Sequence, residues 1–238
     1  MSKQDQYTMT DPRTQYDSDH THYSSDQPDP ALDKKLDPSA DHGETTYRGS
    51  ERLKGRKALI TGGDSGIGRA VAIAFAREGA DVVINYLPSE KVDGESTLEI
   101  LKEAGVSAKG IAGDIKEEDF CVSLVDEAKG FLGGLDIVVN NAGKQQFVED
   151  IENLTTEQFR TTFETNVFAM FWITKAAAKY MPPGGSIINS TSIQSYQPSP
   201  GLLDYASTKG AITSFTKSCA KMLIEKGIRV NGVAPGPI

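Results

Sequence analysis

The stretch KALITGGDSGIG, residues 57–68, decides the fold of this chain. Its first five residues form an apolar run typical of a short buried strand, and a helical pattern of apolar residues follows the glycines. Gly62, Gly66 and Gly68 allow the backbone to turn tightly and to approach an anion, which the amides that open the new helix would bind. The GxxxGxG spacing in this context predicts a site for a nucleotide phosphate, with an ordinary βα turn as the alternative.

The same alternation of strand and helix continues along the chain. Strand patterns recur at 81–85, 107–112, 136–140, 186–191 and 228–234, and helical patterns at 67–78, 94–104, 117–132, 155–181 and 204–226. Thr155 begins TTEQ, a capping-box pattern for the helix that follows it. The strands are rich in Val and Ile rather than alternating, which indicates burial on both faces. We therefore expect an α/β fold with a doubly wound parallel sheet, in which ligands bind beyond the carboxyl ends of the strands.

The first 50 residues differ in composition from the rest of the chain. They contain ten acidic and five basic residues and no Val, Ile, Phe or Trp. Such a segment buries too little apolar surface to offset its ordering entropy, so residues 1–50 are predicted to be a disordered acidic tail. An arm that docks on the body or on a neighbouring subunit is the alternative. Residues 51–238 are then the folded domain.

Composition also limits the partners and the compartment. The net charge of the 238 residues is −8 and no basic cluster occurs, so nucleic acid is not an expected partner. No apolar run of about 18 residues and no secretory signal are visible, which argues against a membrane protein. Cys121 and Cys219 are the only cysteines and lie far apart. This usage suits a reducing compartment, and we expect a cytoplasmic protein.

Histidine usage removes several kinds of chemistry. All three histidines, His20, His22 and His42, precede residue 51. A Ser–His–Asp or Cys–His mechanism, or a zinc site with histidine ligands, therefore has no imidazole in the body, and no metal site is predicted. Acid–base chemistry in the body must use Tyr, Lys, Asp or Glu.

The pair Tyr205 and Lys209 is the candidate acid–base group. The two residues are four apart in a predicted helix, so they share one face of it, and they begin that helix at the ligand edge of the sheet. A free phenol titrates near pH ~10, too high for a base at neutral pH. A neighbouring ammonium stabilises phenolate, and lowering the pKa of the phenol by ~3 units requires ~4 kcal/mol of differential stabilisation. A surface Tyr–Lys pair is the alternative.

Polar residues at other strand ends complete the candidate site. Ser192 follows the strand SIINST, where its hydroxyl can donate to a substrate oxygen, although a turn serine is the alternative. Asn166 is a poor mid-helix residue and indicates a local kink or water site, or simply a partly exposed Asn. Asp114 is placed to accept from an adenine amine or to cap a helix. The stretch NNAG, 140–143, ends a strand and is also compatible with a turn.

Together these residues resemble the short-chain dehydrogenase/reductase family over residues 52–238. The resemblance is carried by TGGDSGIG (61–68), GDI (113–115), Asn166, Ser192, NNAG (140–143), YASTK (205–209) and RVNGVAPGPI (229–238). The polar N-terminal extension and the stretches around these motifs further resemble one subgroup. It comprises bacterial general-stress oxidoreductases and plant seed proteins similar to glucose/ribitol dehydrogenase.

The resemblance implies a Rossmann-type sheet with strand order 3-2-1-4-5-6 and a hydride transfer between a nicotinamide cofactor and a carbonyl or alcohol, with sugars and polyols among the candidates. Tyr205 would be the general acid/base, Lys209 would lower its pKa and hold the nicotinamide ribose, Ser192 would orient the substrate oxygen and Asn166 would hold a relay water. The implied cofactor-binding residues are Gly62, Ser65, Gly66, Ile67, Gly68, Asn85, Asp114, Ile115, Asn141, Ala142, Gly143, Tyr205, Lys209, Pro235, Gly236 and Ile238. A homo-oligomer, either dimer or tetramer, is implied through the helices at 155–181 and 204–226.

The choice between NAD and NADP depends on the end of the second strand. An enzyme that uses NAD usually carries Asp or Glu about 20 residues after the glycine loop. The second strand here ends with Asn85 and Tyr86, so no carboxylate repels a 2′-phosphate, and NADP is favoured. No Arg is placed to bind that phosphate, which leaves NAD open.

The sequence stops earlier than the family pattern. Family members continue beyond PGPI through a substrate-covering segment and a seventh strand, whereas this sequence ends at Ile238. Two alternatives to an active oxidoreductase therefore remain: a truncated, non-catalytic nucleotide-binding protein and an interaction or stress-protection protein that acts through its tail.

Overall fold

Six parallel strands form one sheet in the computed structural model, which describes residues 7–9, 11, 31–36 and 40–236. The strand order is β3-β2-β1-β4-β5-β6, which confirms the predicted order 3-2-1-4-5-6. The strands are β1 (Lys57–Thr61), β2 (Asp81–Tyr86), β3 (Ala108–Ala112), β4 (Ile137–Asn140), β5 (Ser186–Ser190) and β6 (Arg229–Val233). The order reverses between β1 and β4, so the carboxyl ends of these two strands open the crevice where ligands bind in such sheets.

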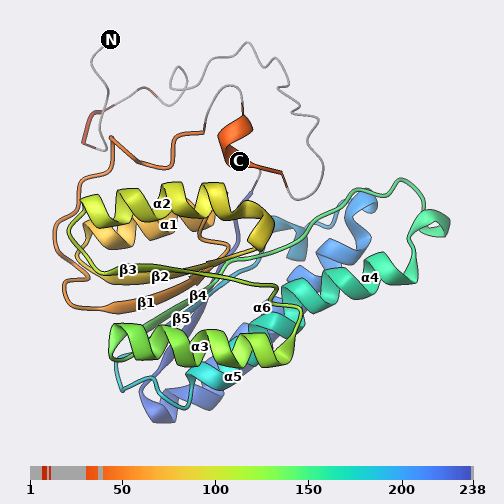
Figure 1. The fold of residues 1–238 in the computed structure, drawn as a ribbon. Coiled ribbons are helices and arrows are strands. Elements are labelled where there is room, and N and C mark those ends of the chain that lie inside the picture. The colour runs from red at the N-terminus through yellow and green to blue at the C-terminus, as the bar shows by residue number, and fades with distance from the viewer. Residues whose placement is uncertain (1–6, 10, 12–30, 37–39, 237–238) are drawn as a thin grey trace.

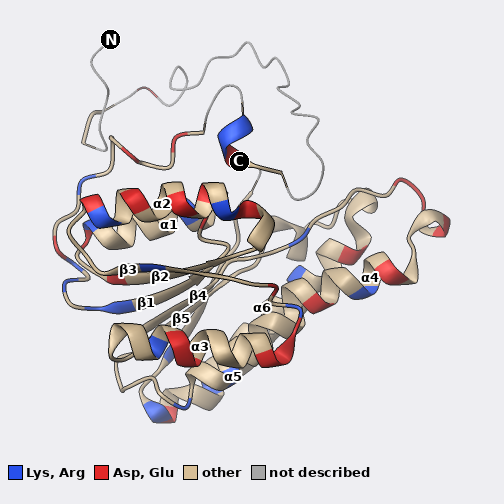
Figure 2. Cartoon of the chain, in the orientation of Figure 1, with Lys and Arg blue, Asp and Glu red and all other residues tan. Residues whose placement is uncertain are grey.

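Helices cover both faces of the sheet (Figure 1). The helices are α1 (Gly66–Arg77), α2 (Lys91–Glu103), α3 (Glu118–Leu132), α4 (Thr156–Phe163), α5 (Ala169–Ala177) and α6 (Leu203–Leu223). Helices α1 and α2 lie on one face, while α3 and α5 lie on the other. Acidic and basic residues are interspersed along α2 and α3 (Figure 2). Within the described ranges, no helix is long and apolar enough to cross a lipid bilayer.

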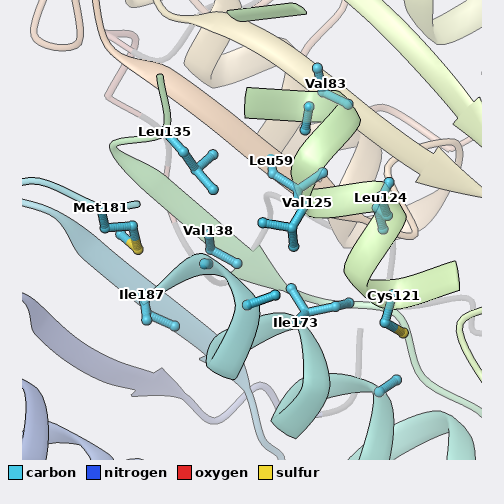
Figure 3. Packing of buried hydrophobic residues seen from close by; sticks show 14 of the residues in the cluster. Leu59, Val83, Cys121, Leu124, Val125, Leu135, Val138, Ile173, Met181 and Ile187 are labelled. Carbon is cyan, nitrogen blue, oxygen red and sulfur yellow. The ribbon is translucent and has the colours of Figure 1, made fainter. Parts of the chain in front are cut away.

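Strand β1 shows why the sheet is buried on both sides. Its side chains alternate between the two layers: Leu59 belongs to the cluster under α3 and α5, whereas Ala58 and Ile60 belong to the cluster under α1 and α2. All three are fully buried. Figure 3 shows the first cluster, with Leu59 from the sheet beside Val125 of α3. The near-continuous apolar run in the sequence is thus explained by two cores.

The long helix predicted over 155–181 is divided into three parts. Helix α4 and helix α5 are joined by a π-helical turn at Glu164–Phe168, and α5 ends at Ala177. Asn166 lies in this π turn, which is the local irregularity that its poor helix propensity predicted. At the other end, the Thr155 side chain accepts a hydrogen bond from the Gln158 N–H at 3.1 Å, as expected of an N-cap.

Two described parts of the N-terminal segment, one at Asp33 and one at residues 43–47, hydrogen-bond to α1 and α2. The Arg77 guanidinium, at the end of α1, donates to the carbonyl oxygens of Gly43, Glu44 and Tyr47. The Asp93 carboxylate of α2 accepts from the backbone N–H of Asp33 at 2.7 Å. These contacts are of the kind expected for the alternative of an arm that docks on the body, and hydrogen bonds make them. The rest of the prediction for residues 1–50 lies outside the described residues.

A single buried carboxylate, that of Glu78, anchors the segment just before β1. Glu78 follows α1 and is 3% exposed. It accepts hydrogen bonds from the Tyr47 hydroxyl at 2.5 Å, from the backbone N–H groups of Ser50 and Arg52 at 2.9 Å each, and from the Arg52 guanidinium. The Tyr47 hydrogen bond, followed by those of Arg52 and Ser50, lowers the pKa of this carboxyl group to about 2.

We predict that Glu78→Gln removes an acid-sensitive part of the folding stability. Because the folded-state pKa is depressed from 4.5 to about 2, the ionised group stabilises the fold above pH 4.5, and this contribution disappears as the pH falls toward 2. The variant should unfold more easily at pH 7 and lose less stability on acidification. Urea unfolding from pH 7 to 2.5 measures both effects. The exposed Glu103→Gln at the end of α2 is the control, and equal pH profiles for all three proteins would contradict the prediction.

Candidate active site

A cleft of about 1020 Å³ opens at the carboxyl ends of the strands, and most of the sequence-predicted site residues line it. The predicted residues in its wall are Gly62, Ser65, Gly66, Ile67, Asn85, Asp114, Ile115, Asn141, Ala142, Gly143, Ser192, Tyr205, Lys209, Pro235 and Gly236. Gly68 and Asn166 lie beside the cleft rather than in its wall. Ile238 lies outside the described residues.

The glycine loop between β1 and α1 forms one end of the cleft. Gly62 and Gly66 have φ values of +61° and +49°, which residues with a side chain rarely adopt. A Cβ atom on Gly68 would lie 1.8 Å from the Gly62 carbonyl oxygen, so this glycine allows the helix to pack on the loop. The first turn of α1 points into the cleft without a side-chain cap at Ser65, which leaves backbone N–H groups for an anion.

The Asn85 side chain at the end of β2 is already committed to structural hydrogen bonds. Its amide donates to the carbonyl oxygens of Ile111 and Gly113, at 3.1 and 3.2 Å. It therefore joins the ends of β2 and β3 and leaves only its oxygen as a possible contact for a ligand.

Asp114 accepts from the Lys116 N–H at 3.0 Å and does not cap α3, whose N-cap is Glu117.

An acidic residue that the sequence interpretation missed lies at the same end of the cleft. Glu90 lines the cleft, one residue before α2. Its carboxylate accepts from the Leu87 N–H at 3.1 Å, which closes a short turn after β2. Glu90 lies beyond the end of β2, and the turn after that strand brings its carboxylate back to the cleft. Its distance from the glycine loop, about 20 residues, is the signal that could have identified it.

Lys209 and Tyr205 meet in the cleft on one face of α6. The Lys209 ammonium lies 5.2 Å from the centre of the Tyr205 ring and donates to the Ser190 carbonyl oxygen at 2.7 Å. Lys209 is 4% exposed, and this burial lowers the pKa of its ammonium from 10.5 to about 8. A buried ammonium and a phenol therefore lie together in the cleft, which is an arrangement that can serve proton transfer.

Ser192 begins the loop after β5 and presents its hydroxyl to the cleft. Its oxygen accepts from the Gln194 N–H at 3.1 Å, as the N-cap of a short 3-10 turn. Because the oxygen acts as acceptor in this bond, the hydroxyl proton can be donated to a bound oxygen atom. The same cleft therefore holds a phenol, an ammonium and a hydroxyl donor.

Asn166 lies behind these groups and connects two segments. Its Oδ1 accepts from the Lys144 N–H at 2.7 Å, and its Nδ2 donates to the Lys144 carbonyl and the Thr208 hydroxyl at 3.0 Å each. It thereby fixes the loop after β4 to α6. It also borders a cavity of about 10 Å³, the size of one water molecule.

Comparison with known proteins agrees with this geometry. A family model described as short chain dehydrogenase matches residues 56–238. The chain belongs to the short-chain dehydrogenase family. The match covers every strand of the sheet and every helix from α1 to α6, and it confirms the resemblance identified in the sequence.

Two relatives of this short-chain dehydrogenase carry the names of the predicted subgroup, and solved structures of other family members share its fold. General stress protein 39 of Bacillus subtilis is 50% identical over 209 residues, which cover 88% of this chain and 73% of that protein. Glucose and ribitol dehydrogenase of Daucus carota is 44% identical over 214 residues, which cover 88% of this chain and 74% of that protein. A short-chain dehydrogenase from Burkholderia cenocepacia in complex with NADP has a TM-score of 0.75 at 35% identity, and the match covers 78% of this chain and 75% of that chain. An NAD⁺-bound xylitol dehydrogenase has a TM-score of 0.74 at 28% identity, and the match covers 78% of this chain and 71% of that chain.

We predict that Lys209→Met stabilises the ligand-free short-chain dehydrogenase at neutral pH. A pKa depressed from 10.5 to about 8 means that folding disfavours the ammonium, so the penalty is complete below pH 8 and disappears between pH 8 and 10.5. The penalty amounts to at most about 3 kcal/mol, and the lost hydrogen bond to Ser190 offsets part of it.

Urea unfolding at pH 7 and at several values up to 10.5 tests the Lys209 prediction. The wild-type free energy of unfolding should rise across this range relative to that of Lys209→Met. The exposed Lys217→Met on the same helix is the matched control and should follow the wild type. A wild type and Lys209→Met with parallel pH profiles would disprove the burial effect.

Proposed function

We propose that the protein is an NAD(P)-dependent oxidoreductase in which Tyr205 donates a proton to, or accepts it from, a carbonyl or alcohol substrate. One observation carries the proposal: the phenol of Tyr205, the ammonium of Lys209 and the hydroxyl of Ser192 line the same cleft as the glycine loop. The family membership supports an enzyme acting on CH–OH groups. No observation favours the non-catalytic alternative over this function.

The glycine loop fits a dinucleotide because of its open amides and close packing. The N–H groups that begin α1 at Gly66 would bind the pyrophosphate, and Asp114 with Ile115 would contact the adenine. Asn141 and Gly143 would lie along the nicotinamide ribose, and the backbone from Pro235 would meet the nicotinamide. The nicotinamide supplies hydride transfer when it is bound. The residues of the chain supply its orientation and a path for the proton.

Proton transfer is the part of the reaction that belongs to the protein. In the reducing direction, Ser192 would donate a hydrogen bond to the substrate oxygen and Tyr205 would donate the proton that this oxygen gains. The Lys209 ammonium stabilises the phenolate that remains. The single-water cavity beside Asn166, which Ser190 also lines, lies next to this group, and we propose that it holds a water that returns the proton.

A polyhydroxylated substrate, such as a sugar or polyol, suits the polar wall beside Tyr205. Gln145, Thr161 and Thr165 line the cleft and offer amide and hydroxyl groups, whereas the side-chain amide of Gln194 is bound to Ser199. The name of the carrot relative, glucose and ribitol dehydrogenase, agrees with this chemistry. We propose that such a compound is the substrate in its aldehyde, ketone or alcohol form.

For the nucleotide, we propose that NADP is preferred. The side chains that end β2 at Asn85 and Tyr86 carry no negative charge, so this strand end does not repel a 2′-phosphate. The Glu90 carboxylate, although it lines the cleft, is bound to the Leu87 N–H. The related structure in complex with NADP supports the same choice, whereas the NAD⁺-bound xylitol dehydrogenase shows that the fold accepts both.

We also propose that the protein is a cytoplasmic homo-oligomer, a dimer or tetramer. The outer face of α4, the π turn and α5 exposes three large aromatic side chains, those of Phe159, Phe168 and Phe171. Neighbouring rings on this face already contact one another, as Phe159 and Phe163 do at 4.9 Å between ring centres. An exposed aromatic face of this kind is typical of a surface that a second subunit covers.

We predict that Tyr205→Phe abolishes turnover and leaves nucleotide binding intact. The substitution removes only the hydroxyl, so the rate of reduction of an aldehyde or sugar should fall by about 10²-fold or more. The dissociation constant of NADPH, measured by its fluorescence, should change by less than about threefold. Full activity in the variant would refute the role of Tyr205. Tight nucleotide binding by a wild type that turns over no aldehyde, ketone, sugar or polyol would favour the non-catalytic alternative.

We further predict a higher kcat/KM with NADPH than with NADH. Steady-state rates with each nucleotide at one saturating substrate concentration measure the ratio. Glu90→Gln should raise that ratio, because removing a carboxylate near a 2′-phosphate removes repulsion, while the exposed Glu103→Gln should not. A wild type that prefers NADH would show that the charge-free end of β2 does not decide the choice.

A further inference from the structure

Asp204, the residue directly before Tyr205, is a buried carboxylate that the proposed reaction does not use. It lies in the first turn of α6 and is 1% exposed. A carboxylate this far from water is stable only where hydrogen-bond donors meet its oxygens. The identity of these donors shows which parts of the structure Asp204 holds in place.

One oxygen of Asp204 holds the backbone of Tyr205. The Tyr205 N–H donates to Oδ1 at 2.8 Å. The N-cap residue of α6 is Leu202, whose side chain has no acceptor, so the first amides of this helix need another partner. Asp204 provides one from inside the first turn, where a negative charge also interacts favourably with the helix dipole.

The other oxygen of Asp204 attaches α6 to α4. The hydroxyl of Thr162 donates to Oδ2 at 2.7 Å, and the side-chain amide of Gln158 donates to it at 3.2 Å. These two residues are one turn apart on α4, and Thr162 is fully buried. Three donors from two helices thus converge on one carboxylate.

The carbonyl side of Tyr205 is held as well. The Thr208 hydroxyl donates to the Tyr205 carbonyl oxygen at 2.6 Å and accepts from the Asn166 side chain at 3.0 Å. Asn166 belongs to the π turn that follows α4. Both peptide groups of Tyr205 are therefore tied, through Asp204 and Thr208, to the continuous α4–π–α5 helix.

We propose that Asp204 is a positioning residue that fixes Tyr205 against α4 through Thr162 and Gln158. The inference rests on the proposed function, because the position of Tyr205 limits turnover only if its phenol transfers the proton. Tyr205 lies in the first turn of its helix, where the backbone is least constrained by intrahelical hydrogen bonds. A displacement of about 1 Å at a reacting group can cost about 10²-fold in rate.

The test compares Asp204→Ala with Asp204→Asn. Alanine removes both acceptors, and we expect kcat to fall about 10- to 100-fold while the NADPH dissociation constant stays within about twofold. Asparagine keeps an acceptor for the Tyr205 N–H. Its NH₂ can donate to the Thr162 oxygen, whose own proton goes to the Gln158 carbonyl at 2.9 Å. The Gln158 side-chain amide, which can no longer donate at this point, has to turn so that its oxygen faces the new NH₂ group. We therefore expect Asp204→Asn to restore kcat to within about threefold of the wild type.

Two further variants complete the design. Asp119→Ala removes the second residue of α3, a position equivalent to that of Asp204 in α6, but Asp119 is exposed. It controls for the helix dipole and should leave kcat unchanged. Thr162→Val keeps the shape of Thr162 and removes only its donor, so it remains informative if Asp204→Ala does not fold. It should lower kcat less than Asp204→Ala does.

A readout independent of turnover separates this inference from the proposed function. Hydrogen exchange of the peptide that contains residues 203–209, followed by mass spectrometry, should be faster in Asp204→Ala and unchanged in Asp204→Asn. If exchange is faster in Asp204→Ala but the wild type turns over no substrate, the proposed function fails and the anchoring by Asp204 stands. The proposal is overturned if Asp204→Ala keeps wild-type kcat and exchange. It is also overturned if Asp204→Asn is as impaired as Asp204→Ala, which would assign the effect to charge.

Discussion

The contact between the Lys209 ammonium and the Ser190 carbonyl is the constraint on which the site depends. The Lys209 Nζ, in the first half of α6, lies 2.7 Å from the carbonyl oxygen of Ser190, the last residue of β5. Lys209 is almost completely buried. A buried cation must have a hydrogen-bond acceptor, so the helix has little freedom to slide along the strand. Tyr205, one turn earlier on the same face, is therefore held at the mouth of the cleft. The parallel sheet determines where the cleft lies, and the hydrogen bond between Lys209 and Ser190 determines how α6 is placed against β5.

The fold and the centre of the site could be predicted because their signals are local. A five-residue apolar strand, a glycine loop and an amphipathic helix follow one another within residues 57–77, and the YASTK stretch places two side chains on one helix face without any tertiary information. The strand order followed from the family resemblance and was confirmed. The features that periodicity and spacing encode could thus be inferred from the sequence alone.

The remaining features depend on contacts between segments far apart in sequence. Nothing near Glu78 shows that Tyr47 and Arg52 would surround it. Nothing near Asn85 shows that its amide would donate to carbonyls at the end of β3. For residues 1–50, composition left a docked arm only as the alternative, because apolar content does not show hydrogen bonds to distant segments. Asn166 was an intermediate case. Its poor helix propensity predicted an irregular turn, but its partners on α6 could not be inferred.

The position of Glu78 has a practical consequence for where the domain begins. A boundary drawn by composition would cut at residue 51, and a shortened protein made on that plan would keep the carboxylate while discarding Tyr47 and Ser50, two of its donors. The cut would also free the guanidinium of Arg77 from the carbonyls of residues 43–47. The smallest unit in which Glu78 and Arg77 keep these partners therefore starts before residue 43. Part of the polar extension thus belongs to the folded domain.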